Sequence, residues 1–207
     1  MNQRTGRAAL LVGAIVPPLF VAIFLIGGLI HPGYNAITDY VSELSRGEMG
    51  WLQVLNFVIL GIGMLTFAAG IRWGAGRGAG STAGPIIFAL VGVASLVGGI
   101  FVTDLHTAKV ATTSGTIHDL AALLIFAGAT VASFVFARRF HNRMRIYSIA
   151  TGLFVVASFL ALSPLTSAFD ILGVTQRVTV IAAFAWITVL ALALRAERAL
   201  PPQMTRS

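Results

Sequence analysis

Six apolar segments, each long enough to cross a lipid bilayer as a helix, dominate this chain. A transmembrane helix needs about 17–25 residues to span the hydrocarbon core, and none of the segments shows the alternating polarity of a membrane β-strand. Only 10% of the 207 residues are charged and 57% are hydrophobic, which excludes a soluble domain. The sequence therefore predicts an all-α fold, a single domain over 1–207 that forms a bundle of six transmembrane helices. The predicted spans are 8–30, 51–71, 85–103, 120–137, 146–163 and 178–194.

The basic residues are divided unequally between the two sides of the membrane. Eleven of the fourteen lie on the side of the N-terminus, and only Arg46, Lys109 and Arg177 lie on the other. Positive charge in short loops marks the cytoplasmic side. We therefore expect a multi-pass protein of the cell (inner) membrane with both termini in the cytoplasm and the first segment retained. The net charge of +7 then reflects orientation and contact with anionic membrane lipids, and no nucleic-acid partner is expected.

The side opposite the termini, here called the outer side, collects most of the polar chemistry. Six of the seven acidic residues and three of the four histidines fall in its loops. In the first of these loops, apolar residues at positions 37, 40, 41 and 44 follow helical spacing. The spacing predicts a short amphipathic helix over 35–46 that lies in the membrane interface.

Capping residues predict where two of the helices begin. Thr38 is the expected N-cap of the interfacial helix. Thr116 and Asp119 have the spacing of a capping box and lie just before the fourth apolar segment. We therefore expect the fourth helix to start close to residue 120.

We expect the outer loops to enclose a polar pocket that is accessible to lipid. Its predicted core is Glu43, His118 and Arg177, with the 35–46 helix as a partial lid. Asn56 is expected one to two helical turns below the membrane surface. There it either lines the floor of the pocket or makes an interhelical hydrogen bond.

Arg177 has two alternative roles. It precedes the sixth apolar segment and Arg195 follows it, so both side chains can snorkel to the ends of one helix. Alternatively, Arg177 pairs with a carboxylate or grips an anionic lipid headgroup with both arms of its guanidinium. The candidate carboxylates are Glu43, Asp104 and Asp170.

The outer histidines raise the question of a metal or haem. His31, His106 and His118, together with carboxylates, have the chemistry of a zinc site with an open position for water. His31 and His118 could alternatively serve as the two axial ligands of a haem. The candidate ligands come from separate segments without local ligand spacing, so no cofactor is firmly predicted.

With these residues in view, the chain resembles the prokaryotic domain-of-unknown-function family 998, a group of six-span membrane proteins. The resemblance covers most of the chain and rests on HPGYNAITDYVSELS followed by WLQVLNFVILGIG, on TIHDLAALLIF, and on GVTQRV with a later Trp. The family has no established activity. The resemblance implies that the same outer groups recur in it, namely Tyr34, Ser42, Glu43, Asn56, His118, Gln176, Arg177 and Trp186.

Three functions are compatible with these features. Binding of a lipid or small amphiphile is favoured, because the bundle offers no continuous polar path for ions. The first alternative is a lipid hydrolase or transferase that uses His118 as acid/base or zinc ligand, with Glu43 and Asp104 as further catalytic candidates. The second is a passive scaffold or accessory subunit that binds another membrane protein or a second copy of itself. The predicted ligand-binding residues are Tyr34, Ser42, Glu43, Asn56, His118, Gln176 and Arg177.

Overall fold

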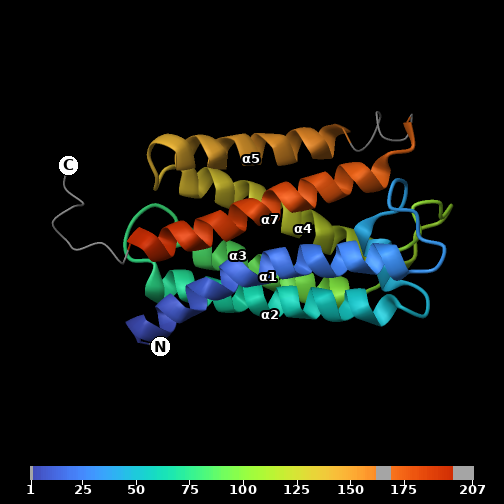
Figure 1. Cartoon of the computed structure of the whole chain (residues 1–207), viewed down its shortest axis with the longest axis horizontal. Helices are drawn as coiled ribbons and strands as arrows, with labels where there is room; N and C mark the ends of the chain where they lie inside the picture. Colours follow the sequence, from blue (N-terminus) through green and yellow to red (C-terminus); the bar gives the residue numbers. More distant parts are fainter. Residues whose placement is uncertain (1, 162–168, 198–207) are drawn as a thin grey trace.

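A computed structural model of the chain describes residues 2–161 and 169–197 (Figure 1). Within these ranges there are six long helices, one short 3-10 helix and no strand. All six long helices are long and apolar enough to cross a membrane, so the predicted all-α bundle of six helices is confirmed. The elements are α1 (Gln3–Ile30), η1 (Val41–Ser45), α2 (Gly50–Gly74), α3 (Ala83–Ile100), α4 (Thr113–Ala137), α5 (Asn142–Ala161) and α7 (Leu172–Glu197).

The helices alternate in direction, so the connections gather at the two ends of the bundle. Loops 31–49 and 101–112 lie together at the end that the charge distribution predicts to face outward, and this end is called the outer end (Figure 1, right). Loops 75–82 and 138–141 lie at the opposite, inner end. This arrangement brings the polar residues of these two outer loops to one place.

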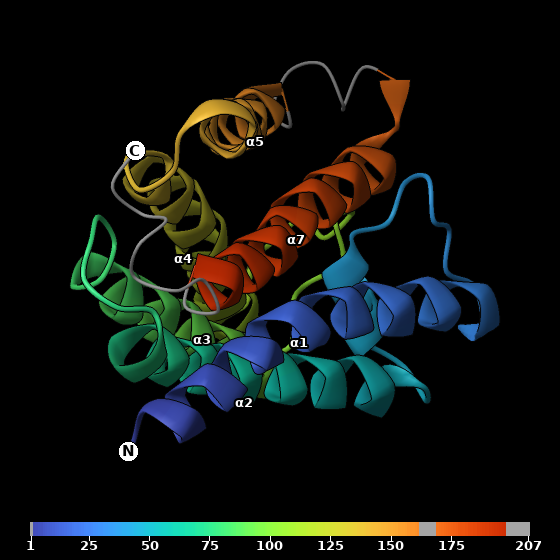
Figure 2. The same ribbon diagram turned by 60° about the vertical axis from the view of Figure 1, so that its left-hand side comes forward.

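Each helix packs against its neighbours in sequence, and α7 closes the bundle by packing against both α1 and α5. The most apolar stretch of α5 is only 28% buried, against 56% for α2 and α7, so α5 lies at the periphery. Figure 2 shows α5 at the edge of the bundle, beside α4 and α7. A peripheral helix leaves apolar surface on α4 and α5 open to lipid.

The centre of the bundle depends on one very close helix crossing. A Cβ atom added to Gly61 of α2 would lie 2.8 Å from the carbonyl oxygen of Gly92 in α3, and one added to Gly92 would lie 2.8 Å from the carbonyl oxygen of Gly61. Only residues without a side chain permit two helix backbones to approach so closely. The pair therefore sets the spacing of α2 and α3.

Two long helices begin earlier than their apolar segments predict. α4 starts at Thr113, with Thr112 as its N-cap: the Thr112 hydroxyl accepts a hydrogen bond from the Gly115 backbone N–H at 3.0 Å. The predicted capping box is wrong, because Thr116 and Asp119 lie inside the helix. α7 starts at Leu172 instead of residue 178. In both helices the first turns are polar, so a search for apolar runs misses them.

The predicted interfacial helix over 35–46 is replaced by a shorter element. Only Val41–Ser45 is helical, as a 3-10 turn, and all five residues are buried within the protein. Local side-chain bonds compete with helix formation before it: Asp39 Oδ2 accepts from the Asn35 N–H at 2.8 Å, and Asn35 Oδ1 accepts from the Ile37 N–H at 3.0 Å. The expected cap is also wrong, because the Thr38 hydroxyl binds the Asp39 carboxylate at 2.7 Å.

Candidate functional site

The 3-10 helix η1 acts as a wedge in the outer end of the bundle. Val41 and Leu44 belong to the hydrophobic core and are each 3% exposed, and η1 packs against α1, α2 and α7. Its N-terminus is held by Glu43, whose Oε1 accepts a hydrogen bond from the Tyr40 N–H at 3.1 Å. The polar residues Ser42, Glu43 and Ser45 of η1 are therefore buried in the outer end of the bundle.

The first two turns of α7 hold the loop that leads into this wedge. The Val174 N–H donates to the Ile37 carbonyl at 3.1 Å, and Gln176 Oε1 accepts from the Val41 N–H at 2.6 Å. Gly173 lies so close to the loop that an added Cβ would collide with the Asp39 carbonyl oxygen. α7 and residues 36–41 are therefore in direct backbone contact.

Arg177 completes this contact through backbone carbonyls. Its guanidinium donates to the carbonyl of Ala36, to that of Asp39 at 3.3 Å, and to the hydroxyl of Tyr34. Of the alternatives for Arg177, pairing with a carboxylate is wrong, since Arg177 makes no ion pair with any acidic residue, all of which the structure describes. The reason is geometric: the first outer loop folds back over α7, so that its backbone carbonyls point toward the Arg177 guanidinium.

Tyr34 lies between the arginine and the loop. The Arg177 guanidinium carbon is 5.2 Å from the centre of the Tyr34 ring, and the Tyr34 hydroxyl donates to the Tyr40 carbonyl at 3.1 Å. Burial raises the pKa of Tyr34 to about 12, although the neighbouring guanidinium acts in the opposite direction. The phenol therefore stays protonated and can donate to the carbonyl at any physiological pH.

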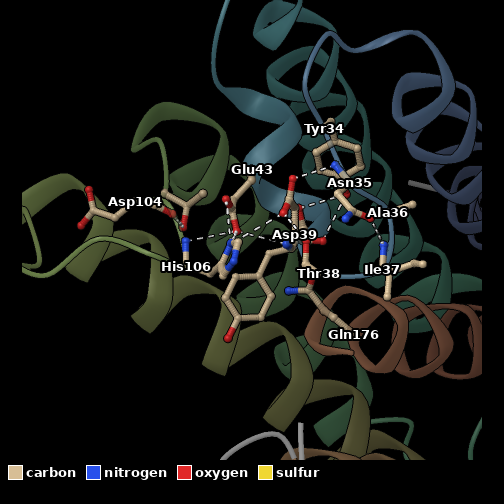
Figure 3. Close-up of polar contacts among 12 residues, drawn as sticks. Tyr34, Asn35, Ala36, Ile37, Thr38, Asp39, Glu43, Asp104, His106 and Gln176 are labelled. Carbon is tan, nitrogen blue, oxygen red and sulfur yellow. Dashed lines mark hydrogen bonds and ion pairs between the residues drawn. The ribbon is translucent and has the colours of Figure 1, made fainter. Parts of the chain in front are cut away.

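A second polar group joins the wedge to the loop between α3 and α4. Glu43 is only 4% exposed, and its Oε1 lies 3.1 Å from His106 Nδ1 and 3.2 Å from the His106 backbone N–H. Asp39 Oδ1 lies 3.8 Å from the same ring nitrogen. Figure 3 shows the His106 side chain between Glu43 and Asp39. The buried carboxylate of Glu43 is thus satisfied by a histidine from another loop.

His118 forms the third polar group, separate from the first two. Its Nδ1 lies 2.9 Å from the Gly98 carbonyl and 2.8 Å from that of Phe101, at the end of α3. Both partners are acceptors, so Nδ1 carries a proton, and in this tautomer of the imidazole Nε2 is an acceptor. The ring is 3% exposed and packs edge-on against Phe57 at 5.7 Å.

A cavity of about 50 Å³ lies beneath the wedge. Three of its lining residues are polar, Ser42, His118 and Gln176. The other lining residues are Phe20, Val41, Phe57, Leu60, Gly98, Ala122, Ile125, Phe126, Val180 and Phe184. Since a cavity needs about 10–15 Å³ of such space to hold one water molecule, this cavity has room for a few waters or for one end of a larger molecule.

An apolar groove of about 310 Å³ runs between α4 and α5. Phe126 lines both the groove and the cavity, so the walls of the two spaces share one side chain. The groove residues are Leu123, Phe126, Ala127, Thr130, Val131, Val155, Val156, Phe159 and Leu160. The groove faces the periphery, where lipid would surround the protein.

The seven predicted ligand residues therefore fall into separate sets. Ser42, His118 and Gln176 line the cavity; Glu43 pairs with His106; and Tyr34 and Arg177 hold the first loop. Asn56 is fully buried and donates to the Phe20 carbonyl at 3.0 Å, a hydrogen bond between α2 and α1. The aromatic walls of the cavity were not predicted, because a phenylalanine within an apolar segment carries no sign of which way it faces.

The three candidate metal ligands also lie apart. His31 Nε2 is 2.7 Å from the Arg46 carbonyl, whereas His106 and His118 belong to the second and third polar groups. Over residues 2–161 and 169–197, no three histidine, aspartate or glutamate side chains are placed to hold one metal ion. The zinc and haem hypotheses stay predictions, to be tested by metal analysis and visible absorption of the purified protein.

Asp104, a candidate catalytic residue, anchors the start of α4. Its carboxylate accepts from the Thr112 N–H at 2.7 Å and from the Thr112 hydroxyl at 2.8 Å. These bonds lower the pKa of Asp104 below its ordinary value of 3.8. Because the folded-state pKa is lowered, the carboxylate stabilises this helix start above the unfolded-state pKa. That stabilisation is lost as the pH falls through the folded-state pKa.

We therefore expect amide protection at the start of α4 to depend on acid pH. Between about pH 5 and about pH 3, the hydrogen-exchange protection factors of residues 112–116 should fall in the wild-type protein. In Asp104→Asn they should be lower throughout and lack this pH dependence. An equal pH dependence in both proteins would show that Asp104 does not hold the helix start.

A protein-family model described as "Protein of unknown function (DUF998)" matches residues 14–193. The match runs from within α1 to within α7 and includes all three polar groups and the cavity. No curated protein and no solved structure matches the chain.

Proposed function

The chain belongs to the DUF998 family, whose function is unknown, and from this premise we propose that its outer cavity binds one end of a lipid or small amphiphile. The observation that carries the proposal is the composition of the cavity wall: His118, Ser42 and Gln176 supply hydrogen-bonding groups, and the rest is apolar. A binding site of this kind orients a ligand through a few polar groups and holds it by apolar contact.

The polar end of the ligand would meet His118 and Gln176. With Nδ1 committed to α3, His118 offers Nε2 as an acceptor for a hydroxyl or amide of the ligand. Gln176 uses its oxygen on the Val41 N–H, which leaves its amide nitrogen as a donor. The site thus presents one acceptor and one donor.

The apolar end of the ligand would lie in the groove between α4 and α5. This groove has about six times the volume of the cavity, at about 310 Å³ against about 50 Å³, and it is almost wholly apolar. Phe126 lines both spaces, and we propose that a rotation of its side chain joins them when the ligand binds. Burial of an acyl chain contributes about 0.8 kcal/mol per CH₂ when the chain comes from water. A membrane ligand comes from the lipid bilayer, which is as apolar as the groove, so this contribution is largely absent. The selectivity of the site therefore rests on the polar end of the ligand.

The proposed setting is a cell membrane with both termini in the cytoplasm. The arginine-rich inner end would then face the cytoplasm, and the cavity would open at the level of the outer leaflet. A ligand could enter sideways from that leaflet without crossing water.

Filling the cavity is expected to remove the bound ligand. Ala122 lines the cavity, and Ala122→Phe would occupy the space beside His118. Native mass spectrometry of protein purified in mild detergent should show a co-purified amphiphile, reduced about tenfold in this variant, equivalent to about 1.4 kcal/mol. Ala185→Phe adds the same ring on the exposed face of α7 and should retain the ligand. Equal retention in both variants would contradict the proposal.

A second substitution separates ligand binding from the role of His118 in capping α3. In His118→Asn, the amide nitrogen takes the place of Nδ1 and can still donate to the carbonyls of Gly98 and Phe101, whereas the Nε2 acceptor is lost. Stability should change by less than about 1 kcal/mol, while the bound amphiphile decreases. His118→Ala should reduce both. If His118→Asn keeps the full complement of ligand, His118 serves only as a cap.

A further inference from the structure

The glycine-rich segment between α2 and α3 folds into a defined loop at the inner end. Its sequence, WGAGRGAGSTAG, has the composition of a flexible linker. Three of its glycines, Gly76, Gly78 and Gly80, have positive φ angles of 70°, 147° and 84°, and the Ser81 N–H donates to the Gly78 carbonyl at 3.1 Å. These conformations are readily accessible only to glycine, so the glycines specify a shape.

Arg139 holds this loop from the neighbouring turn. Its guanidinium donates to the Ala75 carbonyl at 2.6 Å and to the Ala79 carbonyl at 3.4 Å. The same guanidinium binds Glu197 of α7 at 2.8 Å. The loop is therefore held at its start and at its middle by Arg139, which is itself bound to α7.

The folded loop and the adjoining ends of α2 and α3 line an open cavity of about 510 Å³ with both polar and apolar walls. Two guanidinium groups, Arg72 and Arg77, line it together with the hydroxyls of Ser81 and Thr82 and the indole of Trp73. Arginine and hydroxyl groups around one cavity form the donor set that recognises phosphate oxygens.

No acidic side chain of the described residues neutralises the positive charge of this cavity. All seven acidic residues lie in the described part of the chain, and neither Arg72 nor Arg77 forms an ion pair with any of them. Glu197 is the only acidic residue on the inner side, and it pairs with Arg139. Two guanidinium groups without an acidic partner at one cavity are thus available to bind an anion from outside.

The location of the cavity identifies the source of that anion. Trp73, at the end of α2, is 46% exposed, and Ile86, in the first turn of α3, is 60% exposed. An exposed tryptophan above exposed aliphatic side chains is typical of the membrane interface, the level of the lipid headgroups. We propose that this cavity binds the phosphate of an anionic phospholipid of the inner leaflet, with its acyl chains along the exposed faces of α2 and α3. The site is distinct from the outer cavity and independent of its function.

Lipid retention in nanodiscs tests this assignment. Wild-type protein is ejected from nanodiscs of mixed phosphatidylcholine and phosphatidylglycerol, and native mass spectrometry should show protein with bound phosphatidylglycerol. In the double variant Arg72→Gln/Arg77→Gln, the amount of this lipid-bound protein should be about tenfold lower. The control is Arg143→Gln with Arg145→Gln, which removes two exposed inner arginines outside the cavity and should leave retention unchanged. Circular dichroism should show equal helix content in all three proteins.

Two results would overturn the assignment. Equal loss in both arginine pairs would mean that only the overall charge of the inner end attracts anionic lipid. Inorganic phosphate that displaces the bound phosphatidylglycerol, or that binds equally well in pure phosphatidylcholine, would make a free phosphate compound the occupant. Ala122→Phe should leave this lipid in place, so failure of the outer-cavity proposal and failure of this one are distinguishable.

Discussion

Arg177→Met is expected to release the first outer loop from α7 and to lower the free energy of unfolding by about 2–3 kcal/mol, as for the loss of hydrogen bonds to a charged group. The guanidinium binds two backbone carbonyls and the Tyr34 hydroxyl, and methionine can replace none of these bonds. The loop continues into η1, whose residues are buried, so its release should expose the wedge to solvent.

The absence of cysteine makes the expected opening easy to measure. Ser42→Cys places a single thiol at a position that is 8% exposed. Maleimide should modify it slowly in an otherwise unchanged protein and at least about tenfold faster when Arg177→Met is added. Arg177→Lys keeps the charge but loses the two-armed geometry, so an intermediate rate is expected.

Arg195→Met provides the matched control, because Arg195 is an exposed arginine near the opposite end of the same helix. It should leave both the labelling rate and the stability unchanged. If the thiol at position 42 reacts equally fast with and without Arg177, the contacts seen here do not hold the loop.

Gly92→Val is expected to cost about 3 kcal/mol or more, because the bundle would have to separate α2 from α3 to accommodate it. The added Cβ alone would lie 2.8 Å from the Gly61 carbonyl, and also 3.0 Å from the Leu65 backbone nitrogen. Backbone atoms cannot rotate away as a flexible side chain can. Gly61→Val should have a similar effect from the opposite side of the crossing.

The two glycine substitutions should be strongly non-additive. Once one valine has forced the helices apart, the second meets less resistance, so the double variant should cost less than the sum of the single ones. Leu90→Val introduces the same β-branched side chain on the exposed face of α3 and should change stability by less than about 0.5 kcal/mol. Unfolding titrations in mixed micelles would give these values, and a Gly92→Val protein as stable as the control would contradict the close crossing.

The fold was predictable from the sequence because the membrane imposes a minimum length on apolar helices. The resemblance to the 998 family was also confirmed, by a match over residues 14–193. The helix starts at the outer end were not predictable in the same way. The first turns of α7, residues 172–177, contain polar residues and are taken for a loop when only apolar runs are counted. For this reason the contact between α7 and the first outer loop was not predicted.

Part of the outer site was predictable, and part was not. Polar residues in outer loops were expected to gather, and Ser42, His118 and Gln176 do line one cavity. Of the alternatives for Arg177, pairing with a carboxylate was wrong, and its backbone carbonyl partners could not be predicted because backbone carbonyls leave no trace in a sequence. Trp186, which the family resemblance singled out, is fully buried and donates to the Ser148 hydroxyl at 2.9 Å. That contact links α7 to the peripheral α5 and requires a three-dimensional structure to be found.

An experimental density map of the protein in a lipid nanodisc tests the proposed binding site most directly. We expect elongated density that passes Phe126 from the groove between α4 and α5 into the outer cavity. Its inner end should lie within about 3.5 Å of His118 Nε2 or of the Gln176 amide nitrogen. A cavity that contains only water, or one closed by its own side chains while lipid stays outside the bundle, would contradict the proposal that this protein binds an amphiphile there.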